Sequence, residues 1–147
     1  MIDFVNLMLA ALLVGTMFGV WLFLNPARLD ASSYITVQQQ AIRTLNTALP
    51  VLGAATILVT LAAATVGRED GGRLWLLVAV VLCFVTSGLI TRFLNQPINA
   101  IVVHWRGDAP PSYWTEVRDL WWRWHRARLA MGLAGLALLI AATLERV

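Results

Sequence analysis

Four long apolar runs constrain this chain more than any other feature of its sequence. A helix needs about 20 mainly apolar residues to cross the hydrocarbon core of a bilayer. The first run meets this length directly, and each of the last two continues into a polar, aromatic stretch that can extend a helix to the headgroups. The runs are Phe4–Leu24, Ala48–Val66, Leu74–Ile90 and Leu129–Leu144.

These runs predict an all-α fold in which four helices form a membrane-embedded bundle. The chain has 147 residues, 59% of them hydrophobic, which suits a single integral membrane domain over 1–147. We expect a multi-pass protein of a bacterial inner membrane that has the lipid bilayer as its surroundings. The expected spans cover about 4–24, 48–66, 74–94 and 126–144.

The breaks between the runs predict how the helices are connected. Proline disfavours helix at the residue before it, so Asn25-Pro26 should end the first span. The polar turn Gly67–Gly72 should join the second and third spans as an antiparallel hairpin. Helices over about 34–66, kinked near Pro50, and over about 113–144 are longer than a bilayer requires. The second and fourth helices should therefore extend beyond the membrane on the same side.

The charged residues indicate a membrane protein and give its orientation. All 11 basic residues are arginines, and the net charge is only +3. Because the arginines flank apolar spans, membrane topology and anionic headgroups explain them better than nucleic acid does. More of them lie with the first and third connections than with the second. The tendency of positive charge to stay inside therefore places both termini outside and the polar extensions in the cytoplasm.

The fourth helix carries a polar stripe directly before its apolar run. Trp121, His125 and Arg128 are spaced by four and three residues, which places them on one face. His125 can take or give a proton near neutral pH, and Arg128 can stabilise negative charge developing on an oxygen. Trp121 and Trp124 can pack against a flat ring. The alternative is an interfacial belt, because Trp and Arg collect where helices leave the membrane.

The third helix carries a matching polar face. Arg92, Asn95 and Asn99 share that face if the helix continues past Pro97, which frees a backbone carbonyl and bends the chain. Broken helix near membrane depth is tolerated where it lines a cavity, so these residues are candidates for binding a substrate. The alternative is that the asparagines cap the helix end and that Arg92 extends to the phosphates.

Two weaker patterns lie on the other helices. Gln39 and Arg43 share a face of the second helix and form either a third wall of the same pocket or a solvated surface. Ala11, Gly15 and Gly19 form a seam of small residues on the first helix. Such a seam predicts close helix packing, either within the bundle or in a homo-oligomer.

Several classes of chemistry lack support in the sequence. It contains neither a Gly-rich phosphate loop nor a pair of cysteines for zinc. Its two histidines, His104 and His125, leave haem or copper open as an alternative, but no ligand spacing supports them. We therefore predict a site with no metal and no cofactor, formed by the residues of the third and fourth helices.

The polar segments are similar to those of the anthrone oxygenase-like family of small four-helix membrane proteins. The resemblance rests on Asn95-Gln96-Pro97-Ile98-Asn99, on Trp105 and Trp114, and on Trp124-His125-x-x-Arg128 before the last span. Asn25-Pro26 after the first span also fits. In layout the resemblance covers nearly the whole chain. It implies the four-helix fold and, as in some members, oxidation of an anthrone to an anthraquinone by dioxygen without an obvious metal or flavin.

A reaction of that kind assigns a role to each candidate residue. His125 would take the proton of a flat carbon acid, and Arg128 with Asn95 or Asn99 would stabilise the enolate oxygen. The electron-rich anion could then react with dioxygen directly, so no cofactor is required. Trp121 and Trp124 would hold the ring, and the apolar substrate would come sideways from the lipid.

A non-enzymatic membrane subunit or small-molecule-binding module is the rival hypothesis. In that case the arginines contact headgroups or a partner, and the asparagines cap helix ends. The directions of the side chains separate the two hypotheses. A pocket requires Asn95, Asn99, His125 and Arg128 to converge on one enclosed space.

Overall fold

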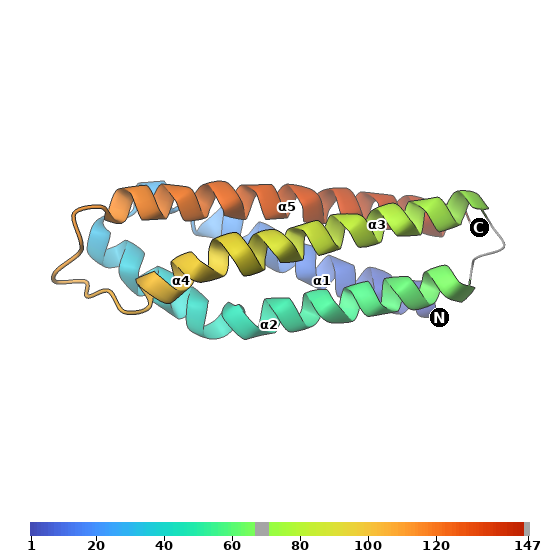
Figure 1. Cartoon of the computed structure of the whole chain (residues 1–147), viewed down its shortest axis with the longest axis horizontal. Helices are drawn as coiled ribbons and strands as arrows, with labels where there is room; N and C mark the ends of the chain where they lie inside the picture. The colour runs from blue at the N-terminus through green and yellow to red at the C-terminus, as the bar shows by residue number, and fades with distance from the viewer. Residues whose placement is uncertain (67–70, 146–147) are drawn as a thin grey trace.

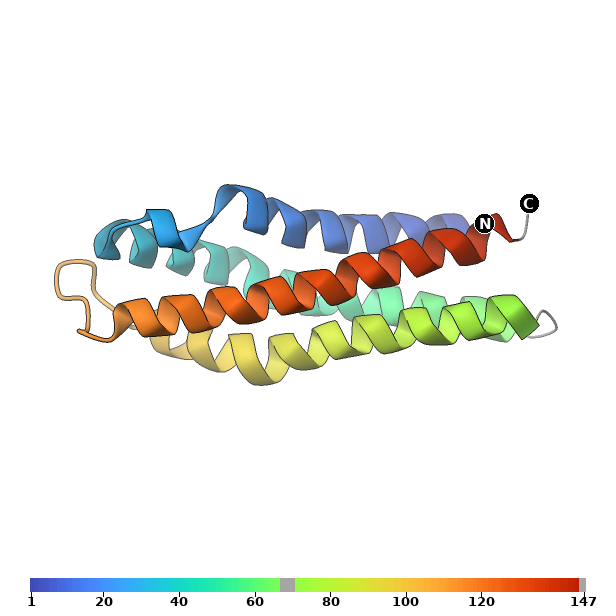
Figure 2. The ribbon, with the colours of Figure 1, turned by 90° about the horizontal axis from the view of Figure 1, so that it is seen from above.

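The predicted all-α fold is confirmed: the computed structural model describes residues 1–66 and 71–145, and these form a bundle of four long helices without a strand (Figures 1 and 2). All four are long and apolar enough to cross a membrane. Both termini lie at one end of the bundle (Figure 1). The elements are α1 (Ile2–Phe23), η1 (Pro26–Arg28), α2 (Ala31–Val66), α3 (Gly71–Ile90), η2 (Thr91–Asn95), α4 (Gln96–Val102) and α5 (Trp114–Leu144).

The helices differ in length, and the difference creates a polar end. The 36 residues of α2 form a helix about 54 Å long, whereas a bilayer core is about 30 Å thick. α5 has 31 residues, but α1 has only 22 and stops short of its neighbours (Figure 2). The third helix also extends, because α3, η2 and α4 continue without a break to Val102. Helical structure therefore continues past the expected span end at 94.

Local sequence explains how α2 begins and bends. The Asp30 carboxylate caps the helix, accepting hydrogen bonds from the Ser33 backbone N–H and hydroxyl, both at 2.9 Å. These hydrogen bonds lower the pKa of Asp30. Pro50 lies inside α2 and removes one backbone hydrogen bond of the helix, and α2 is visibly bent (Figure 1).

A second proline accompanies a wider turn in the third helix. Residues Thr91–Asn95 form a π-helical turn, in which the Gln96 N–H donates to the Thr91 carbonyl. Pro97 follows directly; its ring would clash with the Phe93 carbonyl in a regular α-helix, and the wider turn relieves that clash. The turn rotates the side chains that follow it relative to those of α3.

The core is divided into two apolar clusters along the bundle. One cluster occupies the half that contains the termini and includes Leu13, Met17, Phe84 and Leu139. The other lies towards the extended end and includes Tyr34, Ile98, Val102 and Trp121. The polar residues of the candidate site lie where these two clusters meet.

Small residues allow close helix contact on α5 but not on α1. A Cβ atom added at Gly135 would lie 3.2 Å from Cys83 Cβ and 3.2 Å from the Phe84 ring, so α5 and α3 approach closely there. By contrast, a Cβ atom at Gly15 or Gly19 would meet nothing within 4 Å. The seam on α1 therefore does not pack against another helix within the bundle, and its use in a homo-oligomer stays a prediction.

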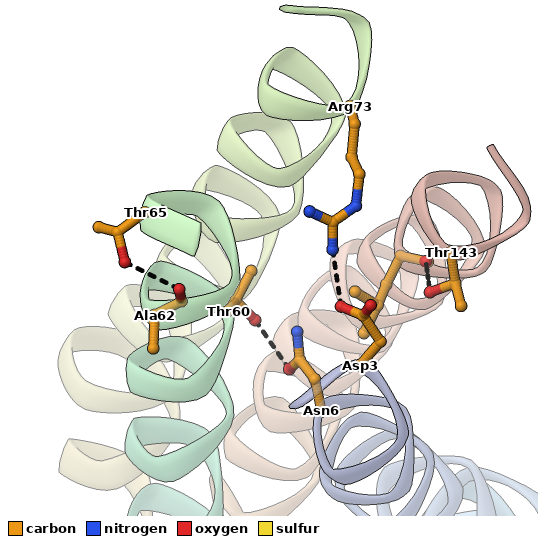
Figure 3. A network of polar contacts seen from close by, with 8 residues as sticks. Asp3, Asn6, Thr60, Ala62, Thr65, Arg73 and Thr143 are labelled. Atoms are coloured by element: carbon orange, nitrogen blue, oxygen red, sulfur yellow. Dashed lines mark hydrogen bonds and ion pairs between the residues drawn. The ribbon is translucent and has the colours of Figure 1, made fainter. Parts of the chain in front are cut away.

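A polar network joins three helices near the termini (Figure 3). Arg73 of α3 forms a buried ion pair with Asp3 of α1 at 2.6 Å. One turn deeper, the Thr60 hydroxyl of α2 donates to Asn6 Oδ1 at 3.0 Å, and both residues are fully buried. These pairings lower the cost of keeping polar side chains away from water, because hydrocarbon offers them no other partners.

We expect Thr60→Val to destabilise the bundle slightly. The substitution removes the hydrogen bond to Asn6 and keeps the side-chain shape, and such bonds in membrane bundles contribute about 0.6 kcal/mol, at most about 1.7. The apparent Tm in mild detergent should fall by about 2–4 °C. Thr65→Val is the control, because the Thr65 hydroxyl bonds only the Ala62 carbonyl of its own helix (Figure 3). Equal effects of the two substitutions would contradict a role for the interhelical bond.

Candidate functional site

A buried arginine stands at the centre of the candidate site. Arg128 of α5 is 6% exposed, and its Nε and Nη2 atoms lie 3.2 and 3.0 Å from Nδ1 of the fully buried His125. Its Nη1 donates to the Thr91 hydroxyl at 3.3 Å. A guanidinium has no acceptor, so Nδ1 must be the acceptor in these contacts, and the hydrogen of the neutral imidazole is then on Nε2.

Aromatic rings hold the imidazole of His125 in place. The ring of Trp121 stacks on it with centroids 5.1 Å apart and planes 3° apart, and Trp122 stacks at 5.4 Å and 14°. The Arg128 guanidinium carbon lies 6.0 Å from the Trp121 ring centroid, within the range of a cation–π contact. The stack and the guanidinium together fix the orientation of His125.

Hydroxyl groups of the third helix form further hydrogen bonds with Arg128 and next to it. Ser87 Oγ donates to the Arg128 backbone carbonyl at 3.0 Å, and the Thr91 hydroxyl donates to the Ser87 carbonyl at 2.9 Å. Asn95, which is fully buried, donates from Nδ2 to the Trp121 carbonyl at 3.2 Å. The π-helical turn thus directs Thr91 and Asn95 towards α5.

Asn99 connects three helices at the extended end of the site. Its Oδ1 accepts from Trp121 Nε1 at 2.9 Å and from Gln38 Nε2 at 3.4 Å. Its Nδ2 donates to Asn46 Oδ1 at 3.1 Å. Asn99 therefore links α2, α4 and α5.

Two adjoining cavities meet at Arg128. The apolar cavity has a volume of about 220 Å³ and lies mainly between α2 and α3. The polar cavity is much smaller, about 30 Å³, which suits a single water molecule. Leu49, Pro50, Thr91 and Arg128 line both. The apolar cavity is further lined by Leu13, Met17, Gly53, Ala54, Ile57, Phe84, Ser87, Gly88, Arg92 and Gln96, and the polar cavity by Val20, Gln38, Ala41, Ile42, Leu45, Asn46, Asn99 and Trp121.

The predicted site residues of the third and fourth helices occupy two layers. Arg128, Trp121 and Asn99 line the polar cavity, and Arg128 and Arg92 line the apolar cavity. Asn95 and His125 line neither cavity and lie behind these residues as buried hydrogen-bonding partners. Of the four residues expected to converge on one enclosed space, Asn99 and Arg128 line the polar cavity, whereas Asn95 and His125 line neither cavity.

The other predicted site residues lie outside the cavities. Gln39 Nε2 donates to the carbonyls of Val102, Val103 and Trp105 at 2.8–3.3 Å, which satisfies the end of α4. Arg43 is exposed. Trp124 is partly buried, packs against the second core cluster, and stacks with the Arg123 guanidinium at 5.1 Å.

Gln38, Ser87 and Thr91 are among the polar residues of the site that the sequence did not indicate. Gln38 lies in a run of three glutamines, and only the helix orientation shows which of them faces inward. Ser87 and Thr91 are isolated hydroxyls in or beside an apolar run, where such residues commonly bond a carbonyl of their own helix. Their spacing of four residues, on the face that leads to Asn95, is the signal that could have identified them.

Metal-ligating side chains do not gather in the described part of the chain. Within residues 1–66 and 71–145, no group of three or more His, Cys, Asp or Glu side chains is placed to hold an ion. Cys83 is partly buried beside Gly135, as a small hydrophobe would be. The polar groups at Arg128 are amide, hydroxyl, imidazole and guanidinium groups.

Comparison with known proteins gives one match. A family model described as anthrone oxygenase matches residues 39–138, which is more than half of the chain. Neither a curated protein nor a solved structure matches. The matched region contains both polar segments of the third and fourth helices and all the residues bonded to Arg128.

Proposed function

The chain belongs to the anthrone oxygenase family, and on that premise we propose that it is a membrane-embedded oxygenase that oxidises a flat aromatic carbon acid without a cofactor. The observation that carries the proposal is the apolar cavity of about 220 Å³ with the buried Arg128 at its inner wall. A 150 Å³ apolar cavity accepts benzene, so this volume suits a larger ring system. We propose the bacterial inner membrane as its location, with the extended end in the cytoplasm.

The proposed reaction converts a methylene group and dioxygen into a ketone and water. The carbon acid loses a proton, and its anion transfers electrons to dioxygen, which becomes bonded to the carbon as a peroxide. The proton returns to the outer oxygen, the O–O bond breaks, and the second hydrogen of the carbon leaves with that oxygen as water. Dioxygen is the only oxidant, so the atoms and electrons balance without a flavin or metal.

The side chains at the cavities support distinct roles in this reaction. Arg128 faces the substrate and stabilises the negative oxygen of its anion, because a fixed cation in a dry site acts strongly on developing charge. Trp121 and Asn99 line the polar cavity, which has room for one water molecule. That water molecule can accept the proton and pass it to the solvent beside the exposed side chain of Asn46. His125 holds Arg128 in position through Nδ1.

That His125 is the base stays a prediction. Two substitutions distinguish this role from the alternative, in which His125 only positions Arg128. We expect His125→Gln to retain most of the activity, because the Gln oxygen can accept from the guanidinium as Nδ1 does. His125→Leu should lower the rate about tenfold or more, because Arg128 loses a partner and shifts. The rate of anthraquinone formation measures both. Equal, complete loss in the two variants would instead identify His125 as the proton acceptor.

A direct assay tests the proposed function. Protein purified in mild detergent is mixed with anthrone, and anthraquinone formation is followed by absorbance while an electrode records oxygen uptake. We expect one molecule of oxygen consumed for each anthraquinone formed, at a rate well above that in protein-free detergent. A rate equal to the uncatalysed oxidation would contradict the proposal.

A non-enzymatic binding module is the second candidate function. It is favoured by the hydrogen bonds among the polar side chains at the extended end, where Asn99 alone takes part in three. Such a network also stabilises a bundle that only binds an apolar molecule. Saturable binding of anthrone under anaerobic conditions, without oxidation when air is admitted, would support this candidate.

A further inference from the structure

The outward face of α5 carries its charges in a regular order. Residues that follow one another by three or four positions share one face of a helix, and one such set in α5 is exposed throughout. From the extended end towards the termini, its members are Glu116, Asp119, Arg123, Arg126, Ala130 and Leu133. The face therefore changes from negative to positive to apolar as the helix enters its apolar run.

Two grooves follow this face and share Arg126. The apolar groove lies between α1 and α5, where Trp21 stacks on Phe18 with ring centroids 5.4 Å apart. The residues of α5 that line it are Arg126, Leu129, Ala130 and Leu133. The polar groove lies further out and is lined by Glu116, Asp119, Leu120, Arg123 and Arg126. None of these residues lines the cavities at Arg128, so the face is separate from the site proposed for oxidation.

Arg123 and Arg126 lack an anionic partner in the described part of the chain. No ion pair among residues 1–66 and 71–145 includes either of them. Arg123 lies over the Trp124 ring, with 5.1 Å between the guanidinium carbon and the ring centroid, and both arginines are exposed. Residues three positions apart are neighbours on a helix, and long side chains lean towards its N-terminus. Both guanidinium groups can therefore extend away from the apolar groove and contact one anion together.

The order of groups along this face matches the order of groups in a phospholipid. We propose that the face binds a phospholipid whose phosphate is esterified to a primary amine, as in phosphatidylethanolamine. The phosphate lies between Arg123 and Arg126, the ammonium group lies beside Asp119, and one acyl chain occupies the groove between α1 and α5. Arg123 and Asp119 are about one helical turn apart, roughly 6 Å along the axis, so one headgroup can contact both.

The two carboxylates of the polar groove select the headgroup. Glu116 is exposed, and the Asp119 side chain is 63% exposed even though it forms an ion pair with Arg118 at 2.8 Å. A primary ammonium group has three N–H donors for such oxygens, whereas a quaternary ammonium group has none. A headgroup without a cation would bring its negative charge close to these carboxylates and be repelled. The charge pattern therefore favours an ethanolamine headgroup over choline and glycerol headgroups.

The same pattern disfavours a second copy of this chain as the occupant of the face. Copies inserted in the same direction would place arginine opposite arginine and carboxylate opposite carboxylate, which weakens association. Copies inserted in opposite directions could pair these charges, but only by moving the apolar run of one copy out of the bilayer. A phospholipid complements both the charges and the apolar groove.

Competition among lipids with identical acyl chains tests the proposal. Protein purified in mild detergent is incubated with equal amounts of phosphatidylethanolamine, phosphatidylcholine and phosphatidylglycerol and recovered on an affinity resin, and its bound lipids are counted by mass spectrometry. We expect saturable retention of a single phosphatidylethanolamine molecule per chain. It should be retained at least about fivefold better than either competitor, because only its headgroup forms charge-assisted hydrogen bonds at both ends.

Three variants make the test specific, and each changes exposed residues only. Arg126→Gln should lower the retention of phosphatidylethanolamine about tenfold, because the phosphate loses a cationic donor. The double variant Glu116→Gln with Asp119→Asn should retain phosphatidylglycerol at least as well as phosphatidylethanolamine, because the repelling carboxylates are gone. Arg106→Gln is the control: Arg106 is exposed but lines neither groove, so its loss should leave lipid retention unchanged.

Three results would overturn the proposal. Equal retention of the three lipids by the wild-type protein would show that the face contacts the bilayer without selecting a headgroup. An unchanged preference for phosphatidylethanolamine in the double variant would exclude the role assigned to the carboxylates. A dimer that Arg126→Gln dissociates, with no lipid retained by the wild-type protein, would identify a second copy of this chain as the occupant.

Discussion

Anthrone oxidation should slow by about two orders of magnitude when Arg128 is replaced with glutamine. Removal of one group that stabilises a developing oxyanion typically lowers the rate about 100- to 1000-fold, and among the described residues Arg128 is the only buried cation at the cavities. Glutamine is shorter and uncharged, so it cannot replace the guanidinium at the substrate oxygen. Initial rates of anthraquinone formation, measured at several anthrone concentrations, give the effect on kcat and KM separately.

Two further arginine variants make this prediction specific. Arg128→Lys keeps a positive charge but cannot contact His125 and Thr91 at once, so we expect an intermediate rate. Arg126→Gln removes an exposed charge two residues away and should leave the rate within about twofold, since surface changes of this kind have small effects. An unchanged rate in Arg128→Gln, with the helical content intact, would exclude the proposed role.

The bundle should lose about 3 kcal/mol of stability when Gly135 is replaced with leucine. A Cβ atom there already lies 3.2 Å from Cys83 Cβ and the Phe84 ring, and the larger side chain would force α5 away from α3. Overpacking of this kind costs about 1–3 kcal/mol, occasionally more. The apparent Tm in detergent should fall by about 10 °C. Because α3 and α5 form the most extensive helix pair, the apolar cavity should also lose its shape.

Gly15→Leu is the matched control for that substitution. The same side chain is added in a helix of the same bundle, but at a position where a Cβ atom meets nothing within 4 Å. The apparent Tm of this variant should change by less than about 2 °C. Equal destabilisation by the two variants would show that the loss of glycine, and not the α3–α5 contact, is responsible.

The sequence predicted the helices better than it predicted their ends. Each apolar run lies within a long helix, as expected, because hydrophobicity over about 20 residues is a local property. The third helix continues past Pro97 to Val102, beyond the span end expected near residue 94, since the π-helical turn accommodates the proline. Nothing in the residue pattern alone specifies that turn.

Helix orientation limited the prediction of the site. On α2, Gln38 faces the polar cavity, whereas Gln39 bonds the end of α4. One residue along a helix rotates a side chain by about 100°, so an uncertainty of one position moves a residue from the cavity to another surface. The small residues of α1 show the same limitation, because their spacing is correct for close packing but Gly15 faces outward.

By itself, the sequence determined that the chain is a four-helix membrane protein with a polar end rich in Trp, Arg and Asn. Those properties follow from composition and from the need of every backbone group in lipid to be bonded within its own helix. Only the tertiary structure decided that Arg128 faces two cavities while His125 and Asn95 stay behind them. That division depends on the bend of α2, on the π-helical turn before Pro97 and on the α3–α5 contact at Gly135. These features fix how the helices are rotated against one another, and the rotation is a property of the packed bundle.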